Sequence, residues 1–167
     1  MICDHRLHII DGGSIHNVND ECPIMTQLKV GRQYQVRVEI APKHARIYLD
    51  GIMACQEKRR DRTQFKGVTV YASDPWHTAA DATISNFALD PQRDYTFVGK
   101  APLKLHKGVV LATIDVLPVF YTFQFDLTPG PTKIKKWGSI IHLTGTNKNC
   151  CGYGDRIPGT SMRFCWL

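Results

Sequence analysis

The sequence predicts an all-β protein that folds as a β-sandwich in a single domain over residues 1–167. Apolar and polar residues alternate with a period of two along most of the chain, which is typical of half-buried strands. Turn-forming residues interrupt this alternation at short intervals, and no stretch of about twelve residues shows the apolar period of a helix. Regularly spaced short strands with turns between them indicate a sandwich or a barrel.

The clearest strand pair lies in the first third of the chain. Tyr34–Ile40 alternates apolar with polar residues, Pro42-Lys43 predicts a turn, and Ala45–Leu49 predicts the returning strand. Asp50-Gly51 then predicts a second turn, of the Asp-Gly type that favours a tight hairpin.

Further strands are predicted along the rest of the chain. Every second residue from Val119 to Leu127 is large and apolar, so this strand is expected at the centre of the core. Gln56–Lys66 is rich in charge and predicts a solvated connection rather than a helical turn. Asp90–Tyr95 predicts a join between two halves, 1–92 and 93–167. The other predicted strands are Gly67–Ala72, Ala82–Leu89, Val109–Ile114, Gly138–Thr144 and Thr160–Trp166.

Composition and charge exclude several classes of protein. Apolar residues make up 43% of the chain and charged residues 22%, so the chain can bury a core and is not a disordered tail. No apolar run approaches the roughly 18 residues of a membrane span, and the first residues lack the features of a signal peptide. Any secretion signal would therefore already have been removed. The net charge of +6 argues only weakly for an anionic partner, and we expect no nucleic acid and no membrane insertion.

The cysteines favour disulfides in an oxidising compartment over six reduced, buried thiols. An even number permits three bridges but leaves fifteen pairings open, and no spacing matches a zinc site. The adjacent Cys150 and Cys151 are expected to reach two different partners, or one of them to reach another subunit. The six cysteines are Cys3, Cys22, Cys55, Cys150, Cys151 and Cys165.

Catalytic signatures are weak, so the sequence predicts a protein that is not an enzyme. Ser161 lacks the second glycine of a nucleophile elbow. His5 and His8 would not face the same way on a strand, and no P-loop, dinucleotide or His-Glu-x-x-His motif occurs. A glycoside hydrolase on the same scaffold stays an alternative, because its paired carboxylates are rarely visible in sequence.

Several stretches resemble a jelly-roll domain of secreted cnidarian proteins, similar to the concanavalin-A/laminin-G type of sandwich. Gly67–Trp76 and Ala82–Phe87 resemble the end of that domain, whereas Gly108–Pro118 resembles its beginning. The order is therefore that of a circularly permuted domain, or of two chains that exchange halves. The resemblance continues through Phe123–Thr128, Ile140–Thr144 and Gly152–Pro158.

In a permuted domain the two chain ends would form neighbouring strands. Arg163–Leu167 would then run on into Met1–His5, and Cys3 could bridge to Cys165.

The family resemblance extends to sea-anemone galactose-binding lectins, and it implies a function. We expect a secreted lectin that binds galactose or β-galactoside glycans, with Ca²⁺ as a possible cofactor and a homodimer as the assembly. The alternative is a non-catalytic protein-interaction or structural module of the laminin-G-like kind.

A sugar site on a β-sandwich needs an aromatic surface, planar polar groups and, in some cases, calcium ligands. The segment 146–156 offers sugar-binding and metal-ligating oxygens, although the same residues could simply hold the loop in shape. The candidates there are Asn147, Asn149, Asp155 and Arg156, of which Asp155, Asn147 and Asn149 are the expected Ca²⁺ ligands.

The segment Ser73–His77 offers a ring for stacking, Trp76, with Asp74 and His77 beside it. The alternative is that Trp76 plugs one end of the sandwich. Two other polar stretches, His16–Glu21 and Lys58–Arg62, are interpreted as a solvated loop and a solvated face.

Overall fold

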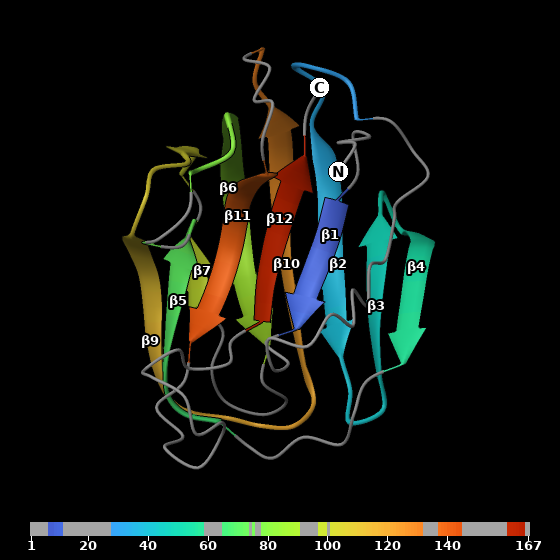
Figure 1. Ribbon diagram of the computed structural model, residues 1–167, viewed down its shortest axis with the longest axis vertical. Helices are drawn as coiled ribbons and strands as arrows, with labels where there is room; N and C mark the ends of the chain where they lie inside the picture. Colours follow the sequence, from blue (N-terminus) through green and yellow to red (C-terminus); the bar gives the residue numbers. More distant parts are fainter. Residues whose placement is uncertain are drawn as a thin grey trace.

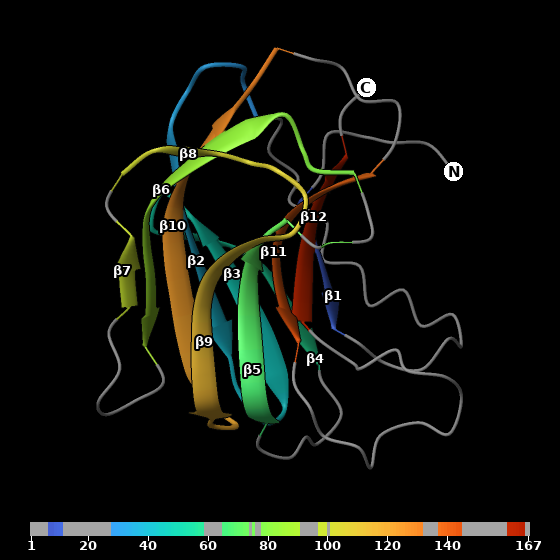
Figure 2. The ribbon, with the colours of Figure 1, turned by 90° about the vertical axis from the view of Figure 1, so that its left-hand side faces the viewer.

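The computed structural model describes residues 7–11, 28–58, 65–73, 75, 78–90, 97–99, 101–131, 137–144 and 160–165. These residues form two sheets of antiparallel strands that pack face to face (Figure 1). Figure 2 shows the sandwich from the side, with β6, β10 and β2 to the left of β11, β12 and β1. The all-β sandwich predicted from the sequence is confirmed. Among the described residues no helix is long and apolar enough to cross a membrane.

The smaller sheet has five strands in the order β1-β12-β11-β5-β9. Their bounds are β1 Leu7–Asp11, β12 Thr160–Cys165, β11 Trp137–Thr144, β5 Phe65–Ala72 and β9 Val109–Leu117.

The larger sheet has seven strands, in the order β4-β3-β2-β10-β6-β7 with β8 also paired to β6. Their bounds are β4 Ile52–Lys58, β3 His44–Leu49, β2 Tyr34–Ile40, β10 Tyr121–Pro129, β6 Ala82–Asp90, β7 Phe97–Gly99 and β8 Leu103–Lys104.

Strands from the two halves of the chain interleave in both sheets. β10, from the second half, lies between β2 and β6 of the first half, and β5 of the first half lies between β11 and β9 of the second. The chain ends also meet, because β1 pairs with β12 and sets Leu7 opposite Phe164. The paired strand is Leu7–Asp11 rather than the expected Met1–His5, which lies outside the described residues, and the permuted order implied by the resemblance stays a prediction. Cys3, which that order would bring near Cys165, lies outside the described residues.

β10 supplies the centre of the core, as its alternation predicts. Tyr121, Phe123, Phe125 and Leu127 are each no more than 1% exposed. The three rings stack in sequence, with centroids 6.5 Å and then 6.4 Å apart. Val119, which the sequence placed on the same face, precedes the strand and is only partly buried.

The central ring of β10, Phe123, is also held from both sides. Phe123 pairs with Val38 of β2 on one side and with Leu89 of β6 on the other. Both partners are buried, so β10 is joined to β2 and to β6 through apolar contacts as well as backbone hydrogen bonds.

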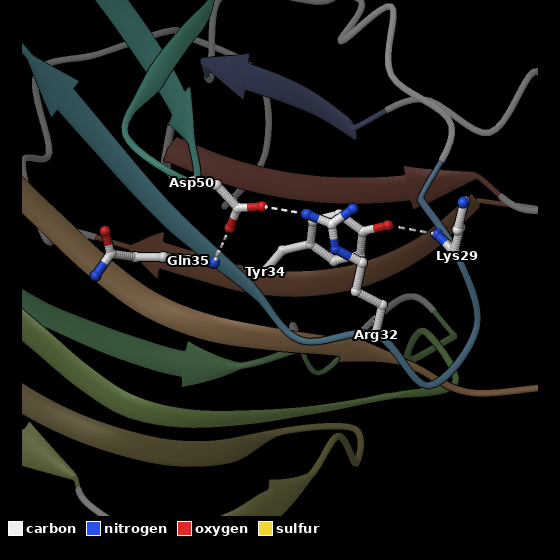
Figure 3. A network of polar contacts seen from close by, with 5 residues as sticks. All are labelled: Lys29, Arg32, Tyr34, Gln35 and Asp50. Atoms are coloured by element: carbon white, nitrogen blue, oxygen red, sulfur yellow. Dashed lines mark hydrogen bonds and ion pairs between the residues drawn. The ribbon is translucent and has the colours of Figure 1, made fainter.

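The Asp-Gly turn forms as predicted and ties three segments together. Leu49 pairs with Ile52, and Asp50 and Gly51 have φ values of 50° and 80°, the geometry of a type I′ hairpin. The Asp50 carboxylate accepts hydrogen bonds from the Gln35 backbone N–H and from Arg32 Nη2, each at 2.9 Å (Figure 3).

The Arg32 guanidinium in turn lies 4.6 Å from the centroid of the Tyr34 ring. The Tyr34 hydroxyl accepts a hydrogen bond of 2.7 Å from the Lys29 N–H, as Figure 3 shows. The start of β2 is therefore held by Asp50 of the β3–β4 turn and by the contacts of Tyr34 with the residues just before the strand.

The connection from β5 to β6 crosses from one sheet to the other beside β11. The Ser139 N–H donates to the Thr78 carbonyl at 2.8 Å, and the Ala80 N–H donates to the Ser139 carbonyl at 3.0 Å. Ala79 thereby forms a parallel bridge with Ser139. This close approach requires glycine at position 138, because an added Cβ there would lie 2.6 Å from the Ala80 Cα.

The sequence missed four strands: β1, β4, β7 and β8. β4 begins with Ile52 and Met53, both exposed, and a register shift opposite Ile47 and Tyr48 breaks its alternation. It continues to Lys58, so the first residues of the predicted charged connection are strand. β4 also carries Cys55, which is disulfide-bonded as predicted for the cysteines.

Asp50→Ala should lower the free energy of unfolding by about 1–2 kcal/mol, because it removes two hydrogen bonds and places alanine at positive φ. Asp50→Asn keeps an acceptor for Gln35 and suits a type I′ turn, so its stability should stay within about 0.5 kcal/mol of the parent. Urea unfolding of both variants measures this. Equal losses in the two variants would contradict the assigned role of the carboxylate.

Gly138→Ala should cost about 1–3 kcal/mol, because the new methyl group would overlap the backbone of Ala80. Chemical denaturation measures the loss, with Thr113→Ala on the exposed side of β9 as a control that should change stability by less than about 0.5 kcal/mol. A neutral Gly138→Ala would mean that the crossing segment does not approach β11 as described.

Candidate functional site

The residues predicted as a sugar and calcium site all lie outside the described residues, so they stay predictions. They are Asn147, Asn149, Asp155, Arg156, Asp74, Trp76 and His77. The described strand ends nevertheless show where the two segments begin. β5 ends at Ala72 and its antiparallel neighbour β11 ends at Thr144, so the two segments leave toward opposite ends of the smaller sheet.

Ser73, the first residue of the predicted stacking segment, is described. It is fully buried, has a φ of 76°, and donates its backbone N–H to the Ile140 carbonyl at 2.7 Å. Its hydroxyl has no hydrogen-bond partner in the described part of the chain. The segment therefore starts from a left-handed backbone conformation, which residues other than glycine rarely adopt. The hydrogen bond to the Ile140 carbonyl of β11 helps to hold this conformation.

The outward face of the larger sheet carries most of the organised polar groups among the described residues. Alternation explains this, because the residues between the buried positions of β2, β3 and β10 must point away from the core. The outward positions on these strands are Gln35, Arg37 and Glu39 on β2, His44, Arg46 and Tyr48 on β3, and Thr122, Gln124, Asp126 and Thr128 on β10.

Asp126 is the centre of the first cluster on this face. Its carboxylate oxygen Oδ2 accepts a hydrogen bond of 2.8 Å from Gln33 Nε2 and one of 2.6 Å from Asn86 Nδ2. The other oxygen, Oδ1, has no partner within the described residues. Two amides thus fix the orientation of the carboxylate through Oδ2, and within the described part of the chain no hydrogen-bond donor contacts Oδ1. We call Gln33, Asn86 and Asp126 the Asp126 cluster.

A β-bulge in β6 directs Asn86 toward Asp126. The pairing of β10 with β6 shifts register between Gln124 and Asp126, so that Asp126 faces Ser85 while Gln124 faces Ala88. Asn86 lies in the bulge with a φ of 51° and is exposed. Bulges and left-handed non-glycine residues occur often at functional sites, where they aim a side chain out of the regular pattern.

A second cluster surrounds Glu39 on the neighbouring strands. Glu39 Oε2 accepts a hydrogen bond of 2.9 Å from the Tyr48 hydroxyl. Arg37 Nη2 lies 3.3 Å from Glu39 Oε1, and Arg46 Nη1 lies 3.8 Å from Oε2. We call Arg37, Glu39, Arg46 and Tyr48 the Glu39 cluster.

The two arginines of this cluster are held by further contacts. The Arg37 guanidinium stacks over the Tyr48 ring with 4.1 Å between its carbon and the ring centroid. Arg46 Nε donates to Gln56 Oε1 at 2.7 Å. Neighbouring side chains therefore hold the planar groups of both arginines on the sheet surface.

The two clusters are neighbours on one surface. Arg37 pairs with Gln124, and Asp126 is the next outward residue along β10, so Arg37 and Asp126 are diagonal neighbours across the strands. Such neighbours lie about 7–8 Å apart between Cα atoms, roughly the size of one sugar ring. The face therefore offers a carboxylate oxygen, amide oxygens and guanidinium N–H groups within one small area.

The described residues contain no group of three or more His, Cys, Asp or Glu side chains placed to hold a metal ion. The expected Ca²⁺ ligands Asn147, Asn149 and Asp155 are oxygen donors of the type that calcium prefers, but only one is a carboxylate. The expected calcium site at 146–156 lies outside the described residues and stays a prediction.

Sequence reasoning missed both clusters. Asp126 and Glu39 are ordinary polar positions of alternating strands, and nothing in the sequence shows which polar residues of different strands will meet. One signal was available in the sequence, because Ile84 and Phe87 are both large and apolar but lie three residues apart. This break in alternation indicates the bulge that the structure shows at Asn86.

Comparison with protein-family models, with curated proteins and with solved structures finds no match for this chain. The lectin resemblance therefore stays a prediction.

Proposed function

We propose that this chain is a secreted, non-catalytic lectin that binds galactose or β-galactoside glycans on the outward face of its larger sheet. The observation that carries the proposal is the Asp126 carboxylate, whose Oδ2 is held by two amides while Oδ1 has no partner among the described residues. A fixed carboxylate accepts hydrogen bonds from sugar hydroxyls with little loss of conformational freedom on binding.

The Asp126 cluster offers hydrogen-bond acceptors that suit the hydroxyl groups of a sugar. The amides of Gln33 and Asn86 each use an N–H on Asp126, which leaves their carbonyl oxygens to accept from further hydroxyls. Acceptors on three neighbouring side chains suit a ligand that carries several hydroxyl donors. The predicted residues of segments 74–77 and 147–156 follow strands of the smaller sheet, so they stay a separate proposal, the second through Ca²⁺.

Secretion and assembly belong to the same proposal. The disulfide at Cys55 supports an oxidising compartment. An open sheet surface binds one monosaccharide only weakly, at about the millimolar level or −4 kcal/mol. We therefore propose a homodimer, in which two sites acting together give useful avidity for clustered glycans.

One observation favours the alternative function, a module that binds another protein. Ile52 is 74% exposed and Met53 53% exposed at the start of the edge strand β4. Such a module would bind its partner there and show no response to sugars.

Asp126→Asn should weaken the binding of methyl β-galactoside at least about tenfold, because it replaces a charged acceptor by a neutral amide. Isothermal titration calorimetry on the purified protein measures the affinity. Asp115→Asn on the exposed side of β9 makes the same charge change on the other sheet and should leave the affinity unchanged. Equal affinities for Asp126→Asn and the parent protein would overturn the proposed site.

The same titrations repeated with excess chelator, and with Asp155→Asn, test the calcium part of the proposal. Loss of binding in both would place Ca²⁺ at segment 146–156. Binding that survives both would remove calcium from the account, and no binding of any galactoside by the parent protein would overturn the lectin function.

A further inference from the structure

We propose that the Glu39 cluster is a subsite for an anionic group, so that the preferred ligands are acidic galactosides that carry a sulfate or a carboxylate. This inference rests on the proposed function and names the class of glycan bound at the same face. Three features of the cluster support it: a net positive charge, guanidinium groups that remain available, and the short distance to Asp126.

The cluster carries an excess of positive charge. Arg37 and Arg46 share one carboxylate, Glu39, so two positive charges face one negative charge and a net charge of +1 remains. Tyr48 and Gln56, which complete the contacts, are neutral. An incoming anion would balance this charge.

Donor groups remain on both arginines. A guanidinium has five N–H donors in a fixed fork, which matches the paired oxygens of sulfate and carboxylate groups. Arg37 uses Nη2 toward Glu39, and Arg46 uses Nε and Nη1, which leaves Arg46 Nη2 and the other nitrogens of Arg37 without partners among the described residues. The two side chains are 42% and 35% exposed, so an anion can reach them from solvent.

The arginines are also oriented before any ligand arrives. Stacking of Arg37 on Tyr48 and the hydrogen bond from Arg46 to Gln56 restrict the two long side chains. Binding therefore costs less side-chain entropy than it would at free surface arginines.

Distance ties this subsite to the Asp126 cluster. Arg37 is a diagonal neighbour of Asp126 across β2 and β10, and Glu39 with its partner Arg46 is the next outward pair along the sheet. A galactose held at Asp126 would thus bring a substituent on the same sugar, or the next sugar of the chain, to the arginines.

The test compares three ligands by isothermal titration calorimetry at low salt: methyl β-galactoside, its 3-O-sulfated form and a sialylated galactoside. The acidic ligand should bind about tenfold more tightly than the neutral one. Arg46→Gln and Arg37→Gln should each remove this advantage. Arg46 lies further from Asp126, so Arg46→Gln should also leave neutral binding unchanged, whereas Arg46→Lys should restore part of the advantage. Lys107→Gln is the charge-matched control on an exposed turn and should keep the full advantage.

The outcomes separate this inference from the proposed function. An advantage for the sulfated ligand alone assigns sulfate, and an advantage for the sialylated ligand alone assigns a carboxylate. Neutral and acidic galactosides that bind equally would overturn the anionic subsite and leave the lectin function intact. An advantage that survives both arginine variants would also overturn it.

Inorganic sulfate gives a readout that does not depend on sugar binding. It should shift the side-chain N–H resonances of Arg37 and Arg46 in the parent protein, and the absence of such shifts would contradict the subsite even if no galactoside binds.

Discussion

The alternation of β10 is the constraint on which the rest of this molecule depends. Its buried rings lie between β2 and β6 and join strands from the two halves of the chain into one sheet. Because successive side chains of a strand point to opposite faces, the burial of Phe125 and Leu127 forces Asp126 outward. The core and the polar face are therefore two consequences of the same pattern, and neither can shift register without the other.

The polar face combines this regular pattern with one irregularity. In a perfectly regular β6, buried and outward side chains would alternate without interruption. Asn86 would then not lie in a left-handed conformation beside Asp126. The bulge between the register pairs of Gln124 and Asp126 supplies the irregularity. The proposed sugar site thus uses a carboxylate placed by regular pairing and an amide placed by a local break in it, next to two arginines that are oriented by Tyr48 and Gln56.

Local sequence signals predicted the strands that carry strong alternation and the turns that require special residues. β2 agrees with its expected bounds, and Asp50-Gly51 forms the hairpin turn that its residue types favour. β4 was missed because Ile52 and Met53 are exposed at an edge, where burial does not impose a period of two. β7 and β8 are too short to show a period, and they form because β6 offers them a partner.

The candidate site was much less accessible from sequence than the fold. Gln33 and Asp126 are far apart in the chain and meet because β10 pairs with β2. This pairing belongs to the tertiary structure and cannot be read from neighbouring residues. Residue types suited to sugar binding drew attention to segments 74–77 and 147–156, where the chemistry is visible in a few neighbouring letters. The described sheet shows that equally suitable groups can be assembled from one or two ordinary polar residues on each of β2, β3, β6 and β10, together with Gln33 just before β2.

The most direct test of this account is to titrate uniformly ¹⁵N-labelled protein with methyl β-galactoside and follow the backbone amide resonances. The account predicts that the largest shifts fall on the outward face of the larger sheet, at Asn86, Gln124 and Asp126 and at Arg37 beside them. Shifts confined to segments 74–77 and 145–159, or no shifts at ligand concentrations above the millimolar range, would contradict the claim that this face binds sugar.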